Sequence, residues 1–298
     1  MIETSLEVEA ALGAGGAVVA LESTVLAHGL PFPRNLEIGV ALEDEVRAEG
    51  AIPATVAVLQ GVPRVGLTPA GLERIAAGHG VMKVSTGDLA VAVARKRDAA
   101  TTVAATMWLS ASVGVRVFAT GGIGGVHRGV PLDASTDLTE LGRTPQVVVC
   151  AGAKAVLDLP ATREALETAG VLVVGWRTDE LPAFYSRKSG LGVDVRVEDA
   201  EEVAALWHAQ RALRSPGALL LCVPPPDEAA LDSSSVETHV ASAIASARSA
   251  GVSGKAITPF LLAEMARLTG GDALEANVAL LLNNARVAAL VALALATT

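Results

Sequence analysis

The segment QVVVCAGAKAVLD, residues 146–158, contains the pattern that decides the fold. It begins with a continuous, β-branched apolar run, which is typical of a strand buried on both faces of a parallel sheet. It continues into a helical pattern that we expect to extend from Lys154 to Ala169. Six further runs resemble its first half: AVVAL (17–21), ATVAVL (54–59), VMKV (81–84), VRVFA (115–119), VLVVGW (171–176) and ALLLCV (218–223).

Helical patterns lie between these predicted strands. We expect helices over Asn35–Glu49, Thr68–Ala77, Asp98–Ser112, Ala200–Arg214, Val236–Ala250 and Pro259–Ala296, the last one broken near Gly270. Strands that alternate with helices of these lengths predict a three-layer α/β/α sandwich with a mostly parallel central sheet. No linker is followed by enough chain for a second domain, so we expect one domain over residues 1–298.

The composition excludes several classes of protein. Hydrophobic residues make up 51% of the chain, but the longest uninterrupted apolar run, Val287–Ala296, has only ten residues. Because a membrane-spanning helix needs about 20 residues, we expect these stretches to form a core and not to contact a membrane. The net charge of −9 argues against a nucleic-acid-binding surface. Cys150 and Cys222 lie in apolar runs and the chain starts without a basic signal region, which together predict a cytoplasmic protein.

Only five residues of the chain are lysines, and a nucleophilic amine has to come from one of them: Lys83, Lys96, Lys154, Lys188 or Lys255. Lys154 lies at the predicted start of a helix, directly after a buried strand. The positive end of a helix and apolar surroundings both disfavour an ammonium, which favours a neutral amine that can form an imine with an aldehyde. The alternative is a lysine that extends to solvent from a helix start.

Polar residues also follow other predicted strands, and ligands of parallel sheets bind beyond the carboxyl ends of the strands. Glu22 ends the first strand and can transfer protons if it is buried, or it is an ordinary loop acid. Lys83 and Ser85 in KVSTGDL combine a cation with a hydroxyl group, which suits a phosphate, although Ser85 or Asp88 can equally cap a helix. His28 is interpreted as structural.

Two further segments combine flexibility or acidity with a regular spacing. The loop ATGGIGGVHRG (119–129) is neither a Walker A loop nor a dinucleotide fingerprint, but its glycines allow a ligand to approach the backbone and His127 can bind an anion. In LDASTDL (132–138), Asp133, Ser135 and Asp137 point one way if the segment is extended, which suits a divalent cation, with a helix cap as the alternative.

Asn277 and Asn284 share a face of an apolar helix, where they bind a ligand or link helices.

Nine segments of the chain occur in one order and together resemble the pseudouridine-5'-phosphate glycosidase family. They are ALESTVLAHGLP, PATVAVLQG, KVSTGDL, TTVAATMWLSASVG, FATGGIGGVHRG, DASTDLTEL, VVVCAGAKAVLD, KAITPFLL and NVALLLNNARVA. The resemblance extends over nearly the whole chain, and several long motifs in a fixed order are far more specific than any one of them. It implies an α/β/α sandwich that assembles as a homotrimer.

The resemblance also implies roles for individual residues. Lys154 matches the lysine that forms an imine with the sugar, Glu22 matches the proton donor, and Asp133 matches the ligand of one Mn²⁺ ion. The remaining matches are substrate-binding positions: Lys83, Ser85, Val103, Thr120, His127, Ser135, Thr136, Asp137 and Asn277. No motif position carries a substitution that indicates lost activity.

The implied reaction is the reversible cleavage of pseudouridine 5'-phosphate into uracil and ribose 5-phosphate. The bond joins two carbon atoms, so the enzyme cannot protonate a leaving oxygen or nitrogen as ordinary glycosidases do. Opening the ribose ring with an amine bonds nitrogen to C1′, and a proton delivered to uracil C5 then lets the C1′–C5 bond break and leaves the sugar as an imine. The residues alone leave two alternatives: a Schiff-base lyase or aldolase acting on another phosphosugar, and a non-catalytic sugar-phosphate-binding protein.

Overall fold

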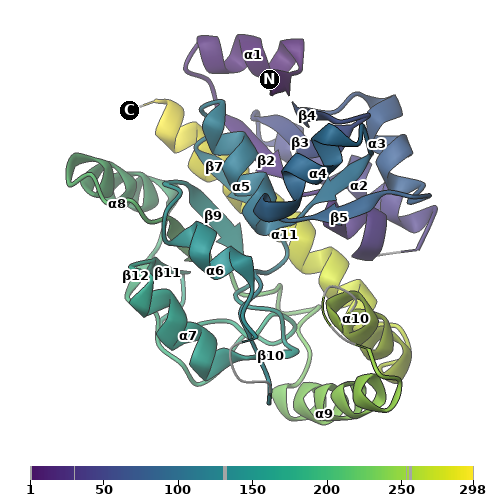
Figure 1. The fold of residues 1–298 in the computed structure, drawn as a ribbon. Coiled ribbons are helices and arrows are strands. Elements are labelled where there is room, and N and C mark those ends of the chain that lie inside the picture. The colour runs from purple at the N-terminus through teal and green to yellow at the C-terminus, as the bar shows by residue number, and fades with distance from the viewer. Residues whose placement is uncertain (1, 30, 130–132, 253, 255–256, 298) are drawn as a thin grey trace.

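A central sheet organises the chain. The computed structural model describes residues 2–29, 31–129, 133–252, 254 and 257–297, which Figure 1 shows as a ribbon. The strands of this sheet are β1 (Glu3–Thr4), β2 (Val18–Leu21), β3 (Ile52–Leu59), β4 (Val62–Val65), β5 (Met82–Val84), β6 (Ala99–Thr101), β7 (Val117–Ala119), β9 (Val147–Cys150), β11 (Leu172–Trp176), β12 (Val195–Val197) and β13 (Leu219–Cys222). Two short strands, β8 (Val126–His127) and β10 (Leu157–Asp158), pair separately and antiparallel.

The middle of the sheet is parallel. Its order is β3-β2-β7-β9-β13-β11-β12, and each neighbouring pair in this series is parallel. β4 and β6 pair antiparallel with β3 at one side, where β1 joins β4 and β5 joins β6. The mostly parallel sheet predicted from the apolar runs is therefore confirmed. Since parallel strands end at one edge, the loops after β2, β7 and β9 converge there.

Helices cover both faces of this sheet. They are α1 (Leu6–Gly13), α2 (Arg34–Ala48), α3 (Pro69–Ala76), α4 (Leu89–Ala94), α5 (Val103–Ser112), α6 (Thr136–Leu141), α7 (Leu159–Thr168), α8 (Ala200–Ala212), α9 (Ser233–Ser249), α10 (Ile257–Leu268) and α11 (Asp272–Ala296). A π-helical turn, η1 (Val25–Gly29), and a 3₁₀ turn, η2 (Thr86–Asp88), complete the description. In Figure 1, α5, α6 and α7 lie in front of the sheet, while α11, packed between α2 and α8, runs behind it. This arrangement confirms the three-layer sandwich.

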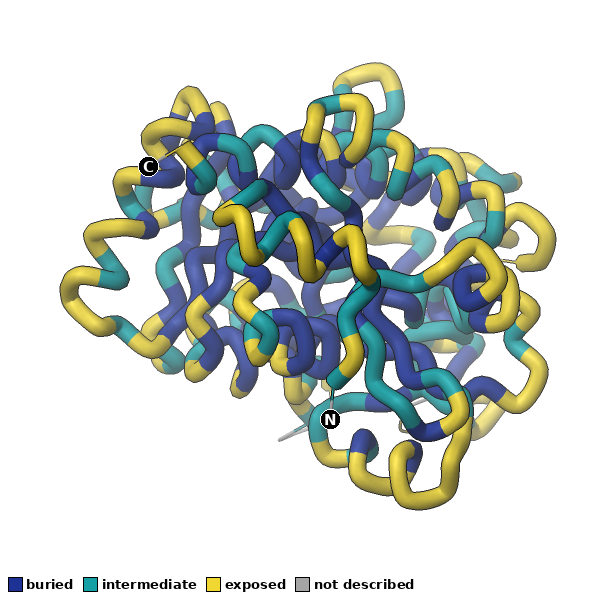
Figure 2. The backbone as a smooth tube through the Cα atoms, turned by 90° about the horizontal axis from the view of Figure 1, so that it is seen from above, coloured by how far each residue is buried: buried dark blue, intermediate teal, exposed yellow. Residues whose placement is uncertain are grey.

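Helix α11 is the one described helix that is long and apolar enough, by length and composition, to cross a membrane. More than half of the most apolar 18-residue stretch of α11 is buried inside the fold. The helix contacts β2, β7 and β9 there. Figure 2 shows the same concentration of buried residues along the middle of the molecule, with exposed residues at its rim. We therefore interpret the hydrophobicity of α11 as that of a core helix.

Two predicted helices begin later than their patterns indicate. The helix predicted over Asp98–Ser112 is interrupted, because residues 99–101 form β6 and α5 begins only after Thr102, whose side chain accepts a hydrogen bond from the Ala105 N–H. The helix predicted from Lys154 begins at Leu159, where Asp158 caps it by accepting from the Ala161 N–H at 3.0 Å. In both cases a capping side chain, rather than the apolar period, sets the first turn. The predicted break near Gly270 is confirmed, since α11 starts after Gly271.

Candidate active site

A cavity of about 510 Å³ lies where the loops after β2, β7 and β9 meet. Eleven of the twelve residues predicted from the sequence line it, although those residues are scattered from the first strand to the last helix. They are Glu22, Lys83, Ser85, Val103, His127, Asp133, Ser135, Thr136, Asp137, Lys154 and Asn277. Thr120, the twelfth, lies behind this wall and hydrogen-bonds to Glu22. The predicted convergence at the carboxyl edge of the sheet is therefore what the structure shows.

Glu22 is a buried acid at the end of β2. Its Oε1 atom accepts a hydrogen bond from the Thr120 hydroxyl, which comes from the end of the neighbouring strand β7. Burial raises the pKa of Glu22, whereas the charge of Lys154 and the hydrogen bond from Thr120 act in the opposite direction. The shift favours a protonated carboxyl group, and Lys154 lines the same cavity as this acid. Such a group can donate a proton within the cavity.

Lys154 lies in the loop between β9 and β10, not at a helix start. Its backbone N–H donates to the carbonyl of Ile123 at 3.1 Å, so this loop is bound to the glycine-rich loop that follows β7. The expected contribution of the α7 dipole was wrong, because that helix begins five residues later and is capped by Asp158. What places the amine is therefore the pairing of two loops, and the side chain extends into the cavity that also contains Glu22.

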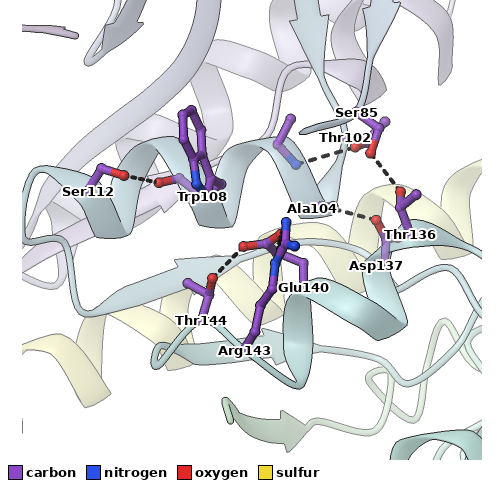
Figure 3. Close-up of polar contacts among 11 residues, drawn as sticks. Ser85, Thr102, Ala104, Trp108, Ser112, Thr136, Asp137, Glu140, Arg143 and Thr144 are labelled. Atoms are coloured by element: carbon purple, nitrogen blue, oxygen red, sulfur yellow. Dashed lines mark hydrogen bonds and ion pairs between the residues drawn. The ribbon is translucent and has the colours of Figure 1, made fainter. Parts of the chain in front are cut away.

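Asp137 joins three elements around the cavity, as Figure 3 shows in part. One carboxylate oxygen accepts from the Ala104 N–H at 3.0 Å, at the start of α5, and the other accepts from the Gly124 N–H at 2.8 Å. Only glycine fits at position 124, because a Cβ atom there would lie 2.3 Å from the hydroxyl oxygen of Ser135. Ser135 itself caps α6 by accepting from the Asp137 N–H at 3.2 Å. The cap that the sequence offered as an alternative is thus present, and its residues line the cavity as well.

A polar corner occupies the side of the cavity formed by β5, η2 and α6. The hydroxyl groups of Ser85 and Thr136 are 2.6 Å apart and hydrogen-bonded (Figure 3). Ser85 also forms a capping box with Asp88, whose carboxylate accepts from the Ser85 N–H at 3.0 Å. The charge of Lys83 adds to the effect of burial in lowering the pKa of His28, and it offsets a part of the rise that burial causes in the pKa of Glu22. A cation beside two hydroxyl groups and a helix start is the kind of environment that binds a phosphate.

Asp133 and His127 form a second polar pair at this cavity. Asp133 Oδ1 lies 3.2 Å from His127 Nδ1, a buried nitrogen atom that has no well-formed hydrogen bond among the described residues. No three His, Cys, Asp or Glu side chains of the described part of the chain gather around one point. A hard divalent cation bound by one carboxylate and completed by water fits this donor set, because such ions retain several water ligands.

Several cavity residues were not predicted from the sequence. His28, which the sequence analysis treated as structural, lines the cavity, and burial together with the charge of Lys83 lowers its pKa. It lies on the π-helical turn η1, a conformation that is frequent at functional sites. Phe184 and Leu281 also line the cavity. No spacing rule identifies them, because both come from apolar segments that are predicted to lie in the hydrophobic core.

The two asparagines of α11 have different places. Asn277 lines the cavity, as predicted. Asn284 is fully buried, and its amide nitrogen donates to the carbonyls of Thr120 at 2.9 Å and Gly121 at 3.4 Å. Asn277 therefore faces the cavity, and Asn284 links α11 to the loop after β7. Lys255 lies outside the described residues.

The fold and the site together define a class: an α/β enzyme that places a buried acid and a lysine in one cavity beside a polar corner. The comparison with protein families narrows this class. The model of the family described as "Indigoidine synthase A like protein" matches residues 7–294, so the chain belongs to that family.

Relatives of known name agree with this placement. A pseudouridine-5'-phosphate glycosidase of Roseiflexus sp. is 57% identical over 99% of this chain and 96% of its own length. The enzyme of the same name from Chloroflexus aurantiacus is 55% identical and covered over 98% of both chains.

Solved structures agree as well. The prealnumycin C-glycosynthase AlnA, determined in complex with ribulose 5-phosphate, is 39% identical with a TM-score of 0.92, covering 100% of this chain and 97% of its own. An indigoidine synthase A-like protein from Thermotoga maritima is 36% identical with a TM-score of 0.91, covering 99% and 97%.

Proposed function

We propose that this chain cleaves the carbon–carbon glycosidic bond of pseudouridine 5'-phosphate and releases uracil and ribose 5-phosphate. The observation that carries the proposal is the pairing of Glu22 with Lys154 in one cavity, at the positions where the sequence resemblance puts the proton donor and the amine. Relatives with this activity in their names are more than half identical to this chain over almost its full length. The family resemblance and the geometry therefore support the same reaction.

The chemistry assigns a distinct task to each of these two residues. Lys154 Nζ bonds to C1′ of the ribose while the C1′–O4′ bond breaks and O4′ takes a proton, which opens the ring. Uracil C5 then receives a proton, the C1′–C5 bond breaks, and the nitrogen lone pair of Lys154 forms the C1′=N bond. Water hydrolyses this imine and releases ribose 5-phosphate. Glu22, whose pKa is raised by burial, donates the proton that uracil C5 receives, and O4′ takes the proton that the Lys154 amine loses on bonding to C1′.

The surrounding residues hold the substrate during these steps. Lys83, Ser85 and Thr136 form the polar corner that suits the phosphate. Asp137 fixes the glycine-rich loop and the start of α5 through its two backbone hydrogen bonds. The roles of Val103, His127, Ser135 and Asn277 as substrate-binding positions complete the proposal, whereas Thr120 acts through its hydrogen bond to Glu22.

Asp133 is the residue that would hold a Mn²⁺ ion, with water as the other ligands. When bound, such an ion supplies positive charge that orders the site electrostatically. We further propose that residues 1–298 form one domain of a cytoplasmic homotrimer that binds neither nucleic acid nor membrane. Support for the single domain comes from the continuous sheet, to which strands from β1 to β13 contribute. Analytical ultracentrifugation tests the trimer directly.

The release of uracil from pseudouridine 5'-phosphate tests the function. The purified protein is incubated with the substrate, with and without Mn²⁺, and free uracil is quantified by chromatography. We expect stoichiometric uracil and ribose 5-phosphate. The absence of uracil under both conditions contradicts the proposal. It favours a lyase or C-glycosynthase that acts on the sugar phosphate and a different partner, and the similarity to the C-glycosynthase AlnA supports this alternative.

A covalent trap tests the mechanism separately. The protein is incubated with ribose 5-phosphate, reduced with borohydride and digested, and the modified peptide is identified by mass spectrometry. We expect the added mass on Lys154, because the imine carbon comes from C1′ of the sugar. The exposed Lys96 serves as the matched control and should remain unmodified. An added mass on another lysine contradicts the assignment of the nucleophile, and no added mass favours a non-covalent sugar-phosphate-binding protein.

A further inference from the structure

The backbone on the two sides of Lys154 is supported unequally. Before it, Ile123 of the glycine-rich loop accepts from the Lys154 N–H at 3.1 Å and donates to the Gly152 carbonyl at 3.1 Å. After it comes a turn, closed by the Leu157 N–H, which donates to the Lys154 carbonyl at 3.0 Å. The turn leads into β10, which has two residues and pairs with β8, also of two. Because a pair of such short strands is weak support by itself, this side of the lysine needs further contacts.

Arg128 supplies such contacts. It directly follows β8, and its Nε atom donates to the Leu157 carbonyl at 2.9 Å. Its Nη2 atom donates to the Ala155 carbonyl at 3.2 Å. The two carbonyls belong to the first and the third residue after Lys154. One edge of the guanidinium group therefore spans the turn that carries the amine, which requires a planar group with several fixed N–H donors.

The other edge of the same guanidinium group is bound to helix α9. Nη1 and Nη2 of Arg128 donate to the two carboxylate oxygens of Glu237 at 2.7 and 2.8 Å. These hydrogen bonds raise the pKa of Arg128 and lower that of Glu237, so both groups remain charged. A bidentate pair of this kind fixes the plane of the guanidinium group. Glu237 thereby orients Arg128 toward the turn after Lys154.

Geometry, and not charge alone, explains an arginine at this position. The neighbouring residue His127 lines the cavity, whereas Arg128 does not, and the N–H groups described above donate to protein atoms. A lysine would keep the positive charge, but its single ammonium group cannot bond to two carbonyls and a carboxylate in these places. The arginine therefore acts on the backbone near Lys154 and not on a ligand.

We propose that Arg128 is a positioning residue that sets where the Lys154 amine lies relative to the sugar, and that Glu237 holds Arg128 in the required orientation. The inference rests on the proposed function, because it concerns the lysine that is proposed to form the imine. With both carbonyls bound, the turn is held against the cavity and Nζ stays within reach of C1′. Without these bonds the amine is present but displaced, so imine formation slows while the substrate-binding residues remain in place.

The rate of imine formation tests this role. Each variant is mixed with ribose 5-phosphate and quenched with borohydride at successive times, and the modified Lys154 peptide is quantified by mass spectrometry. For Arg128→Lys we expect the trapping rate and kcat for uracil release to fall about 100-fold, the scale of a reacting group misplaced by about 1 Å. KM for pseudouridine 5'-phosphate should stay unchanged. Wild-type rates in Arg128→Lys mean that charge alone suffices, and a raised KM at unchanged kcat means a ligand contact; either result overturns the proposal.

Arg116→Lys is the matched control. Arg116 also donates to two backbone carbonyls, those of Leu295 and Gly15. It directly precedes β7, however, so it lies at the opposite edge of the sheet from the cavity. Its trapping rate should equal that of wild type. An equal fall in this variant would be a general effect of losing such an arginine and would overturn the proposal.

Glu237→Gln provides a second variant, in which Arg128 itself remains. The amide oxygen still accepts one hydrogen bond, so the trapping rate should fall, but by less than in Arg128→Lys. Thermal unfolding of each variant ensures that rates are compared per folded protein, and a wild-type trapping rate in Glu237→Gln overturns the role of Glu237. If the wild type traps ribose 5-phosphate on Lys154 but releases no uracil, the proposed function fails while the trapping rates still decide on Arg128. No trapping on Lys154 in the wild type overturns both.

Discussion

Glu22 and Glu43 are two acids in matching surroundings that differ in what lies beyond them. Glu22 follows β2 and accepts a hydrogen bond from Thr120, and Glu43 on α2 accepts one from Thr55 of β3 at 2.6 Å. Burial raises the pKa of both carboxyl groups. Glu22, however, shares a cavity with Lys154, whereas the nearest charges around Glu43 are Arg47, Glu7 and Asp44 on the helical surface.

This comparison teaches that a perturbed acid is not by itself a catalytic one. Desolvation and a threonine hydroxyl produce the same direction of shift in both places. The difference lies in access to a ligand and in the amine opposite the acid, which Glu43 lacks in the described structure. Variants of the two acids should therefore differ in the size of their effect on activity.

Lys154→Arg should have the largest effect. Arginine keeps the positive charge but cannot act as a nucleophile, so turnover should fall by on the order of 10⁴- to 10⁶-fold, as when a covalent catalyst is removed from other enzymes. The measurement is uracil release under single-turnover conditions. Lys96→Arg, at an exposed position, should leave the rate within experimental error. Normal activity in Lys154→Arg would disprove the imine mechanism.

Glu22→Gln should have the next largest effect, and it distinguishes Glu22 from Glu43 most directly. Glutamine retains the shape and the hydrogen bond from Thr120 but carries no proton to donate, so kcat should fall by about 10²- to 10⁴-fold. Trapping of ribose 5-phosphate on Lys154 should persist. The matched variant Glu43→Gln should keep kcat close to that of wild type. Equal losses in the two variants would mean that Glu22 acts only through stability.

Thr120→Val should move a pH profile rather than abolish activity. The Thr120 hydroxyl lowers the pKa of Glu22, so its removal raises that pKa further. Because the reaction needs protonated Glu22, the rate falls as the pH rises through this pKa, and the falling limb of kcat should shift to higher pH. Thr55→Val, which removes the corresponding hydroxyl from Glu43, should leave the limb in place. A shift in both variants would argue against Glu22 as the titrating group.

Glu43→Gln should change only stability, and only slightly. The folded-state pKa of Glu43 is raised by burial, so its contribution to stability is full below the ordinary value of 4.5 and is lost as the pH rises through the raised value. The variant lacks this loss and should gain stability relative to wild type across that window. Urea unfolding at a series of pH values measures the difference. A pH-independent difference would place the effect in packing rather than in ionisation.

Most of the fold and much of the site follow from local patterns. Continuous runs such as QVVVC predict strands because their residues are buried on both faces, and the carboxyl-edge rule then brings Glu22 and Lys154 together. The start of α7 could not be read from the same pattern, because Asp158 and the pairing of Lys154 with Ile123 decide it.

Phe184 marks a different limit of the sequence. Its place in the cavity depends on a left-handed backbone and on the absence of a side chain at Gly122, a residue in a distant motif. Without this contact, an apolar residue in a long connection is predicted to belong to the hydrophobic core. Pattern rules describe a segment by itself, so they cannot show a contact that two segments create only after folding.

The bond from Asn284 to the loop after β7 has a consequence for biosynthesis. The carbonyls of Thr120 and Gly121 are bound by a residue of the last helix, and Asn277 of the same helix completes the cavity wall. A growing chain in which Glu22, Lys83 and Lys154 have already been synthesised still lacks these contacts. A nascent polypeptide therefore lacks this wall of the cavity until α11 is synthesised and docks.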